Sequence, residues 1–230
     1  MIPRGMGGNG VWLFFALSGY LLTRPFIDRH EAWTFQGLVL YLSRRLARIL
    51  PMYWVVVMGY FLLSKYSWRW AYLHLLFRRG DLHLWTVQQE LLFYLLLPGL
   101  LFLIAFLGRS SLLKAALLYG LAIFSGLFLG PDIISLPAIH RYNYVPFQVA
   151  PFLAGMGAAY LFAALPLTFF QRRGKVLLLL LLLGLLYYCN RQWPVATGSR
   201  EIWRVGILFS LLLVAVQLPG PLWLNRVLCF

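Results

Sequence analysis

The segment LWTVQQELLFYLLLP at residues 84–98 places an ionisable side chain, Glu90, near the start of an apolar run long enough to cross a bilayer. A carboxylate in the middle of a spanning helix costs roughly 2.5–3.5 kcal/mol to insert, so such groups usually face a protein interior or a watery cavity. At helical spacing, Thr86, Glu90 and Tyr94 recur every fourth residue and share one face. This pattern predicts a lined pocket. The alternative is a polar packing cluster in which Glu90 pairs with a distant arginine.

The composition extends the membrane interpretation to the whole chain. Of its 230 residues, 62% are hydrophobic and only 11% are charged, whereas a soluble domain carries about 25% charged residues. Leucine-rich runs of about 20 residues recur along the chain, and each is a candidate transmembrane helix. The sequence therefore predicts an all-α, polytopic transmembrane bundle that forms a single domain over residues 1–230.

The apolar runs predict about seven spans separated by polar or basic segments. A basic helix at residues 41–48 leads into the second span, a loop rich in Trp, Arg and His follows at 65–82, and the third span can tilt or kink at Pro98. Gly155 and Gly157, and the Gly126-x-x-x-Gly130 spacing, are expected to allow close helix packing. The approximate spans are 11–27, 49–64, 83–107, 112–130, 145–170, 176–189 and 204–218.

The basic balance of the chain fits a membrane better than a nucleic acid. The formal net charge is +14, but the basic residues lie mostly between apolar runs, where lipid headgroups and the positive-inside rule account for them. Nucleic-acid binding is therefore not expected, and the slight charge bias favours a cytoplasmic location for residues 24–48. Neither a disulfide framework nor a metal site is predicted, because the spacing is wrong for Cys189, Cys229, His30, His74, His83 and His140.

A second segment, YLSRRLARILPMYW at residues 41–54, brings Arg44, Arg45 and Arg48 to one end of a spanning helix. Their i, i+3 and i, i+4 spacing crowds three guanidinium groups together. Arginine forks suit bidentate phosphate contacts, which a nucleotide-bearing donor would need. The alternative is ordinary anchoring by arginines that contact lipid headgroups.

A third segment, GVWLFFALSGYLL at residues 10–22, contains a hydroxyl near the centre of the first span. Ser18 has no base nearby in the sequence that would activate it, so a nucleophilic role is not expected. We expect the Ser18 hydroxyl to bond its own helix backbone, beside a glycine, Gly19, that allows close packing.

Together these segments resemble the signatures of the membrane-bound acyltransferase 3 family. Residues 10–21 are similar to its G-V-x-L-F-F-x-L-S-G-[FY]-L signature, and residues 45–54 to its R-x-x-R-I-x-P-x-Y-W signature. Residues 85–98 are similar to W-[ST]-L-x-x-E-x-x-F-Y-x-x-x-P, with Val87 at the Leu position, and residues 152–160 to a later F-L-x-G-x-x-x-A-Y helix. The order and approximate spacing of the motifs agree over nearly the whole chain.

The resemblance implies a membrane O-acyltransferase of the bacterial inner membrane. Such an enzyme moves an acyl group, most often acetyl, from cytoplasmic acyl-CoA to a hydroxyl of a saccharide or lipid-linked acceptor, without a resident cofactor. In that scheme Arg44, Arg45 and Arg48 bind the CoA phosphates, and Glu90 supports catalysis by orienting a partner or the catalytic histidine. The pocket is expected to be lined by Ser18, Trp85, Thr86 and Tyr94.

The chain also departs from the family pattern. The family has about ten spans, and no segment here matches its first helix, which carries the presumed catalytic histidine, or its last helices with G-x-x-S-Y-x-x-Y-L-x-H. The domain is therefore predicted to be incomplete at both ends. The alternative is a non-catalytic membrane remnant or a transporter-like component. His74, His83 and His140 are expected to be loop or interfacial residues rather than substitutes for the base.

Overall fold

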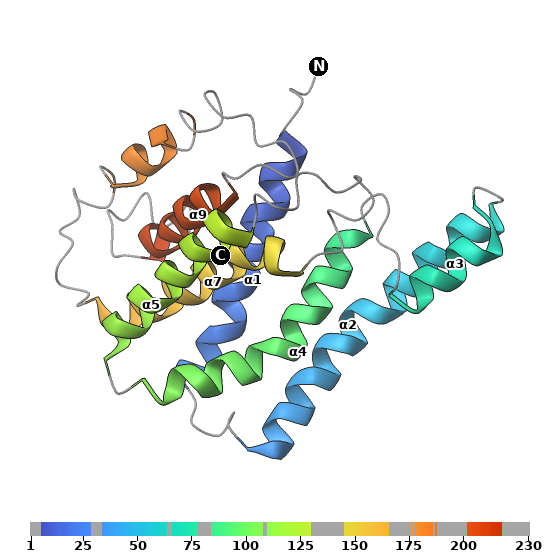
Figure 1. The fold of residues 1–230 in the computed structure, drawn as a ribbon, viewed down its shortest axis with the longest axis horizontal. Coiled ribbons are helices and arrows are strands. Elements are labelled where there is room, and N and C mark those ends of the chain that lie inside the picture. The colour runs from blue at the N-terminus through green and yellow to red at the C-terminus, as the bar shows by residue number, and fades with distance from the viewer. Residues whose placement is uncertain are drawn as a thin grey trace.

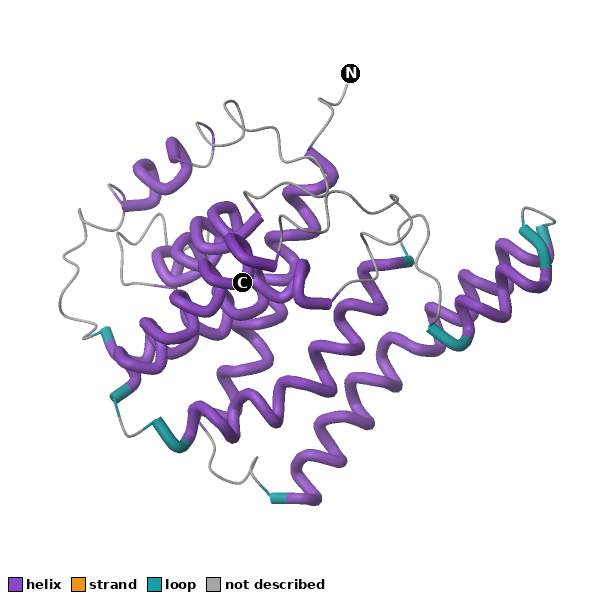
Figure 2. The backbone as a smooth tube through the Cα atoms, in the orientation of Figure 1, coloured by secondary structure: helices purple, strands orange, loops and turns teal. Residues whose placement is uncertain are grey.

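The structure is a computed structural model of the chain, and all the regular secondary structure in its described segments is helical (Figures 1 and 2). It describes residues 6–28, 34–63, 66–77, 84–107, 110–129, 145–165, 176, 178–185, 187 and 202–217. The elements are α1 (Met6–Asp28), α2 (Phe35–Leu62), α3 (Trp68–Leu75), α4 (Trp85–Ala105), α5 (Ser111–Phe124), a π-helical turn η2 (Ser125–Leu129), α7 (Val145–Ala164) and α9 (Ile202–Gln217). A further helical segment occupies residues 178–185.

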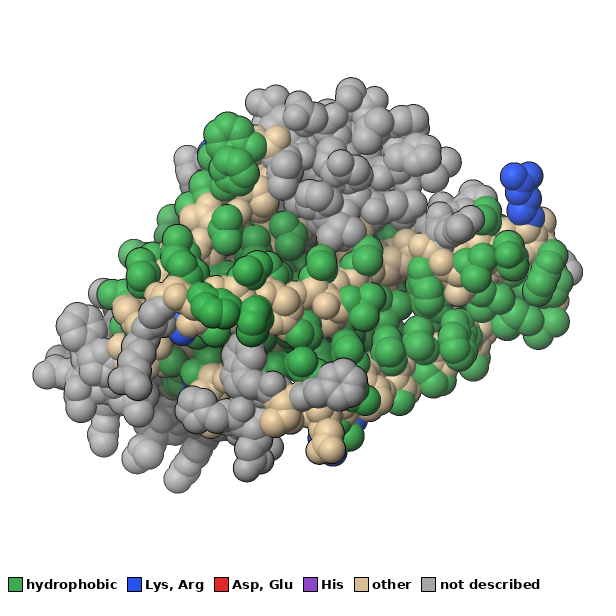
Figure 3. All heavy atoms as spheres, turned by 60° about the horizontal axis from the view of Figure 1, so that its bottom comes forward, with side chains coloured by type: hydrophobic (Ala, Val, Ile, Leu, Met, Phe, Trp, Pro, Cys, Tyr) green, Lys and Arg blue, Asp and Glu red, His purple; other side chains and the backbone are tan. Residues whose placement is uncertain are grey.

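The prediction of a helical membrane bundle is confirmed. Four of the described helices are long and apolar enough to cross a bilayer: Gly10–Asp28, Gln36–Leu62, Trp85–Ala105 and Ser111–Phe128. Shorter apolar helices lie at Val149–Ala164 and Trp203–Gln217. Each of the predicted spans overlaps a helical segment of the described residues, but four of these segments are long and apolar enough to span a bilayer. Hydrophobic side chains dominate the described surface seen in Figure 3.

The second span and the segment after it differ from the prediction. Helix α2 runs without a break from Phe35 to Leu62, so the basic segment is its first half rather than a separate helix. The predicted loop at 65–82 contains α3, which returns alongside α2 (Figure 1). The Ser67 side chain caps α3 by accepting a hydrogen bond from the backbone N–H of Trp70. Aromatic and small side chains of α3 then bury against α2, which stabilises this short helix.

Helix α4 continues through Pro98 and bends partway along its length (Figure 1). Proline has no backbone N–H, so Pro98 cannot donate to the carbonyl of Tyr94 one turn earlier. This missing bond explains the bend, which agrees with the predicted kink.

The bundle is held together by close contact between the backbones of α1 and α7. A Cβ atom added to Gly155 would overlap the carbonyl oxygen of Ala16, and one added to Gly19 would overlap that of Phe152. The predicted packing role of Gly155 is thus confirmed. Two further glycines also meet side chains closely, as predicted: Gly157 lies against Tyr119 and Gly126 against Trp203, whereas Gly130 lies outside the described residues.

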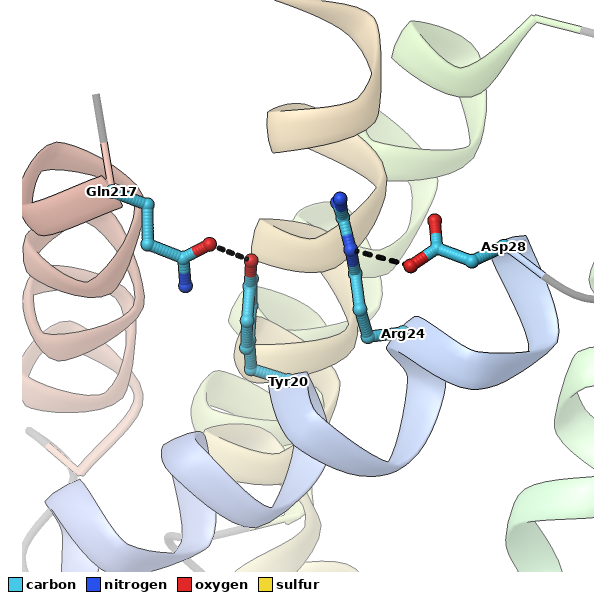
Figure 4. Close-up of polar contacts among 4 residues, drawn as sticks. All are labelled: Tyr20, Arg24, Asp28 and Gln217. Atoms are coloured by element: carbon cyan, nitrogen blue, oxygen red, sulfur yellow. Dashed lines mark hydrogen bonds and ion pairs between the residues drawn. The ribbon is translucent and has the colours of Figure 1, made fainter. Parts of the chain in front are cut away.

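Polar contacts fix the C-terminal half of α1 against α9 and α7 (Figure 4). The Tyr20 hydroxyl donates to Gln217 Oε1 of α9 at 2.6 Å. One turn later, Arg24 Nε pairs with Asp28 Oδ2 at 3.0 Å, while its guanidinium lies 4.8 Å from the ring centre of Phe162 on α7. These contacts orient α1, which carries part of the site described below.

The close contact between the backbones of α1 and α7 predicts that a larger residue at Gly155 destabilises the fold. Gly155→Ala should lower the free energy of unfolding by about 1–3 kcal/mol, because a methyl group must push two helix backbones apart. Gly120→Ala is the matched control, since a Cβ at Gly120 meets no atom within 4 Å and alanine favours a helix by about 1 kcal/mol. Unfolding of the purified protein in detergent measures both. Equal effects of the two substitutions would contradict the close crossing.

Candidate functional site

The Glu90 carboxylate lies inside the bundle, where the side chain is only 4% exposed. Its Oε1 atom accepts two hydrogen bonds, from the Ser18 hydroxyl of α1 at 2.8 Å and from the Tyr94 hydroxyl of α4 at 3.0 Å. Among the described residues no hydrogen bond reaches Oε2. One carboxylate oxygen is therefore fixed by hydroxyl groups, and the other remains available to a further partner.

The contact with Ser18 corrects the prediction for that residue. We expected its hydroxyl to bond the backbone of its own helix, but it donates to a carboxylate 72 residues away. The tertiary partner prevails once α1 packs against α4, because a buried carboxyl group is costly unless it is hydrogen-bonded. Within the described segments no arginine forms an ion pair with Glu90.

Two of the predicted pocket residues occupy different surroundings. Thr86 lies beside Glu90 along a pocket described below. Trp85, by contrast, is buried in the core, with its ring centre 6.0 Å from that of Trp12 and 6.1 Å from that of Phe15. Trp85, the first residue of α4, thus packs against the N-terminal half of α1.

The three arginines line a common pocket of about 400 Å³. This pocket, called here the arginine pocket, lies where the first half of α2 faces the C-terminal end of α1. Arg44 and Arg48 are exposed and Arg45 is half-buried, so the pocket is open to solvent on its arginine side. Its lining consists of Pro25, Phe26, Gly37, Leu40, Tyr41, Arg44, Arg45 and Arg48.

A second pocket of about 340 Å³ lies farther along α2, between α1, α2 and α4. We call it the apolar pocket, because hydrophobic side chains supply most of its wall. Arg48 lines both pockets, and Glu90 and Thr86 are the other polar residues of the second. Its lining consists of Phe14, Arg48, Ile49, Met52, Tyr53, Val56, Leu84, Thr86, Val87 and Glu90.

The two pockets follow one face of α2. Arg44, Arg48, Met52 and Val56 are four residues apart in turn, so their side chains form a row along the helix. With a rise of 1.5 Å per residue, this row spans about 18 Å. It changes from cationic to apolar along its length.

Tyr41 is a site residue that the sequence analysis did not identify. It lines the arginine pocket, and its hydroxyl is buried with no hydrogen-bond partner among the described residues. Its ring packs edge-on against Phe26, at 5.5 Å between ring centres. Its position one helical turn before Arg45 was the available signal. A buried hydroxyl without a partner costs about 1–3 kcal/mol, so this group is suited to a ligand that supplies the missing bond.

His74 also differs from its prediction as a loop or interfacial residue. It is fully buried on α3, where the Tyr53 hydroxyl donates to its backbone carbonyl at 3.0 Å and lies 3.3 Å from its Nδ1 atom. Tyr53 also lines the apolar pocket, so His74 contacts the site through this tyrosine. The other histidines and both cysteines lie outside the described residues. In the segments that are described, no three potential metal ligands gather.

The fold and the site define a multi-spanning membrane protein in which a pocket lined by three arginines lies beside an apolar pocket whose wall includes the buried Glu90. The family model for the acyltransferase domain matches residues 1–230, and the chain therefore belongs to the acyltransferase 3 family. This confirms the resemblance inferred from the motifs. The comparisons with curated proteins and with solved structures gave no match.

An ionised Glu90 predicts how much the hydrogen bond from Ser18 contributes to the free energy of unfolding. Ser18→Ala should lower the free energy of unfolding by about 1.5–3 kcal/mol in the native background, but by only about 0.5–1.5 kcal/mol in a Glu90→Gln background. Ser43→Ala is the control, since Ser43 is exposed and bonds the carbonyl of Leu40, and its effect should be the same in both backgrounds. Identical losses for Ser18→Ala in the two backgrounds would rule out an ionised Glu90 as the acceptor.

Proposed function

We propose that the two pockets form the donor site of a membrane O-acyltransferase that uses acyl-CoA. The observation that carries this proposal is their junction at Arg48, which lines both the arginine pocket and the apolar pocket. An acyl-CoA molecule has the same polarity order, with phosphates at one end and an acyl group at the other. Acyl transfer is the chemistry of the family to which the chain belongs.

The arginine pocket would hold the phosphate groups of the donor. Arg44 and Arg48 are exposed and Arg45 is half-buried, so their guanidinium groups combine access for a ligand with partial desolvation. Planar guanidinium forks bind phosphate oxygens in pairs, which a lysine cannot do. Tyr41 would add a hydrogen bond from its buried hydroxyl.

The thioester would lie in the apolar pocket beyond Arg48, because the pantetheine arm of CoA separates it from the phosphates that Arg48 holds. In the transfer step the acceptor hydroxyl oxygen attacks the thioester carbonyl, the C–O bond forms and the C–S bond breaks. The hydroxyl proton passes to a base, and CoA leaves as its thiol after taking up a proton. Glu90 would act as a positioning residue, because Ser18 and Tyr94 hold its Oε1 and its Oε2 can orient a base or the acceptor.

The acceptor would be a hydroxyl of a saccharide or of a lipid-linked saccharide at the membrane. The family resemblance supports this class, with acetyl as the simplest acyl group and the bacterial inner membrane as the location. A cytoplasmic arginine pocket gives acyl-CoA direct access from the compartment that contains it. Nucleic acid has no part in this reaction, and the apolar helices contact membrane lipids.

The donor site predicts the effect of removing its arginines. Arg45→Ala combined with Arg48→Ala should weaken CoA binding by at least about 100-fold, because two charge-assisted phosphate contacts of about 1.5–3 kcal/mol each are lost. Arg45→Lys should also weaken binding, since a lysine keeps the charge but not the fork. Calorimetric titration of the purified protein with CoA measures each affinity.

Arg69→Ala is the control, because Arg69 is exposed on α3 and lines neither pocket. It should bind CoA as tightly as the native protein. Equal affinities of the double variant and this control would contradict the assignment of Arg45 and Arg48 to the phosphates.

Tyr41→Phe is predicted to change stability and binding in opposite directions. Without ligand the substitution removes a buried hydroxyl that has no partner and keeps the ring against Phe26, so the protein should be equally stable or more stable. CoA binding should weaken by about 3–10-fold, because the ligand loses one hydrogen bond of about 0.5–1.5 kcal/mol. Thermal unfolding with and without CoA measures both effects. A destabilised variant with normal CoA affinity would mean that the hydroxyl has a purely structural role.

A further inference from the structure

The turn that ends α3 contains an aromatic residue in a backbone conformation that usually belongs to glycine. Phe77 has a φ of 56°, and it is the one non-glycine residue with a positive φ among those that the structure describes. A side chain makes this left-handed conformation costly, and the residue that adopts it after a helix is usually glycine. A strained residue persists only where its surroundings hold it, and such residues are concentrated at functional sites.

The Phe77 side chain contacts Tyr53 of α2. The two rings are stacked, with their centres 5.1 Å apart and their planes at 21°, and such aromatic pairs are stabilised beyond the burial of their area. The Tyr53 hydroxyl is also held by α3, because it donates to the backbone carbonyl of His74 at 3.0 Å. The N–H of Phe77 donates to the same carbonyl at 2.9 Å. One turn of α3 therefore fixes Tyr53 at both its ring and its hydroxyl.

Tyr53 belongs to the inner wall of the apolar pocket. This pocket is an open groove, because Phe14, Met52 and Val56 of its wall are exposed. Tyr53 and Leu84 are the buried hydrophobic side chains of the wall, at 3% and 7% exposed. An exposed side chain can move aside, whereas a buried and stacked ring keeps its position. Tyr53 therefore gives the groove a fixed surface.

We infer that Tyr53 forms the surface against which the pantetheine arm of the donor lies, and that Phe77 is a positioning residue that holds the Tyr53 ring for this contact. The inference rests on the proposed donor site, in which Arg48 holds phosphates beside the same groove. Phe77 and His74 line neither the arginine pocket nor the apolar pocket, so they act on the donor through Tyr53. If Phe77 only docked α3 against α2, its loss would not distinguish one ligand from another.

The test titrates the purified protein with CoA and with 3′-phospho-ADP, which is CoA without its pantetheine arm. Phe77→Gly removes the ring and relieves the backbone, because glycine readily adopts a positive φ. This substitution should weaken CoA binding by about 3–10-fold, which corresponds to the loss of one aromatic pair, and leave the affinity for 3′-phospho-ADP unchanged. Phe77→Tyr keeps the ring and should bind CoA as the native protein does. A CoA affinity as low as that of Phe77→Gly would overturn the inference.

Leu76→Gly is the matched control, since Leu76 is the preceding residue, is exposed and lines neither pocket. It should change neither affinity. A loss of CoA binding equal to that of Phe77→Gly would mean that any change in this turn has the effect, and would overturn the inference.

A double variant tests whether Phe77 acts through Tyr53. Tyr53→Leu should weaken the binding of CoA but not of 3′-phospho-ADP, and adding Phe77→Gly should cause no further loss, because the ring that Phe77 positions is gone. Losses that add, or an equal fall in both affinities, would overturn the inference and leave the donor site standing. The same holds if the native protein binds CoA no more tightly than 3′-phospho-ADP. If neither ligand binds, the donor site fails as well.

Discussion

A buried carboxylate between two helices constrains the centre of this bundle. Glu90 lies where water does not reach it freely, so its charge has to be satisfied by neighbouring groups. Ser18 of α1 and Tyr94 of α4 do this through a single oxygen, and the bond from Ser18 ties the two helices together. The backbone contact between α1 and α7, at Gly19 and Gly155, holds α1 in the position that brings Ser18 to Glu90. Helix α1 therefore contributes both to the packing of the bundle and to the hydrogen bonding of Glu90.

Helix α2 has a different part in the structure. Much of its second half is exposed and hydrophobic, as expected for a helix that contacts lipid, but one face carries the row from Arg44 to Val56. The cationic end of this row lines the arginine pocket, and its apolar end lines the apolar pocket. An acyl-CoA that spans both would place its phosphates at the arginines and the arm that carries its thioester along the apolar pocket.

Much of the fold could be predicted from the sequence, because membrane spans follow from runs of apolar residues and close crossings follow from glycines such as Gly155. The hydrogen bond from Ser18 to Glu90 could not be predicted, since it depends on which face of α1 meets α4. Helix α3 was missed because its Trp, Arg and His content is typical of an interfacial loop, while its burial against α2 decides its conformation. Tyr41 was not identified as a pocket residue and the burial of His74 was not predicted, because burial and hydrogen bonding are tertiary properties. That Arg44, Arg45 and Arg48 lie together could be predicted, because it follows from their spacing on one helix.

Photolabelling with a CoA analogue that carries a diazirine on its pantetheine arm tests most directly whether the two pockets form one donor site. If they do, the label will attach to residues 49–56 of α2 or to the start of α4, and excess CoA will suppress the labelling. Labelling of the outer faces of α5 or α9, or labelling that CoA does not suppress, would contradict a continuous donor site that runs from Arg44 to Val56.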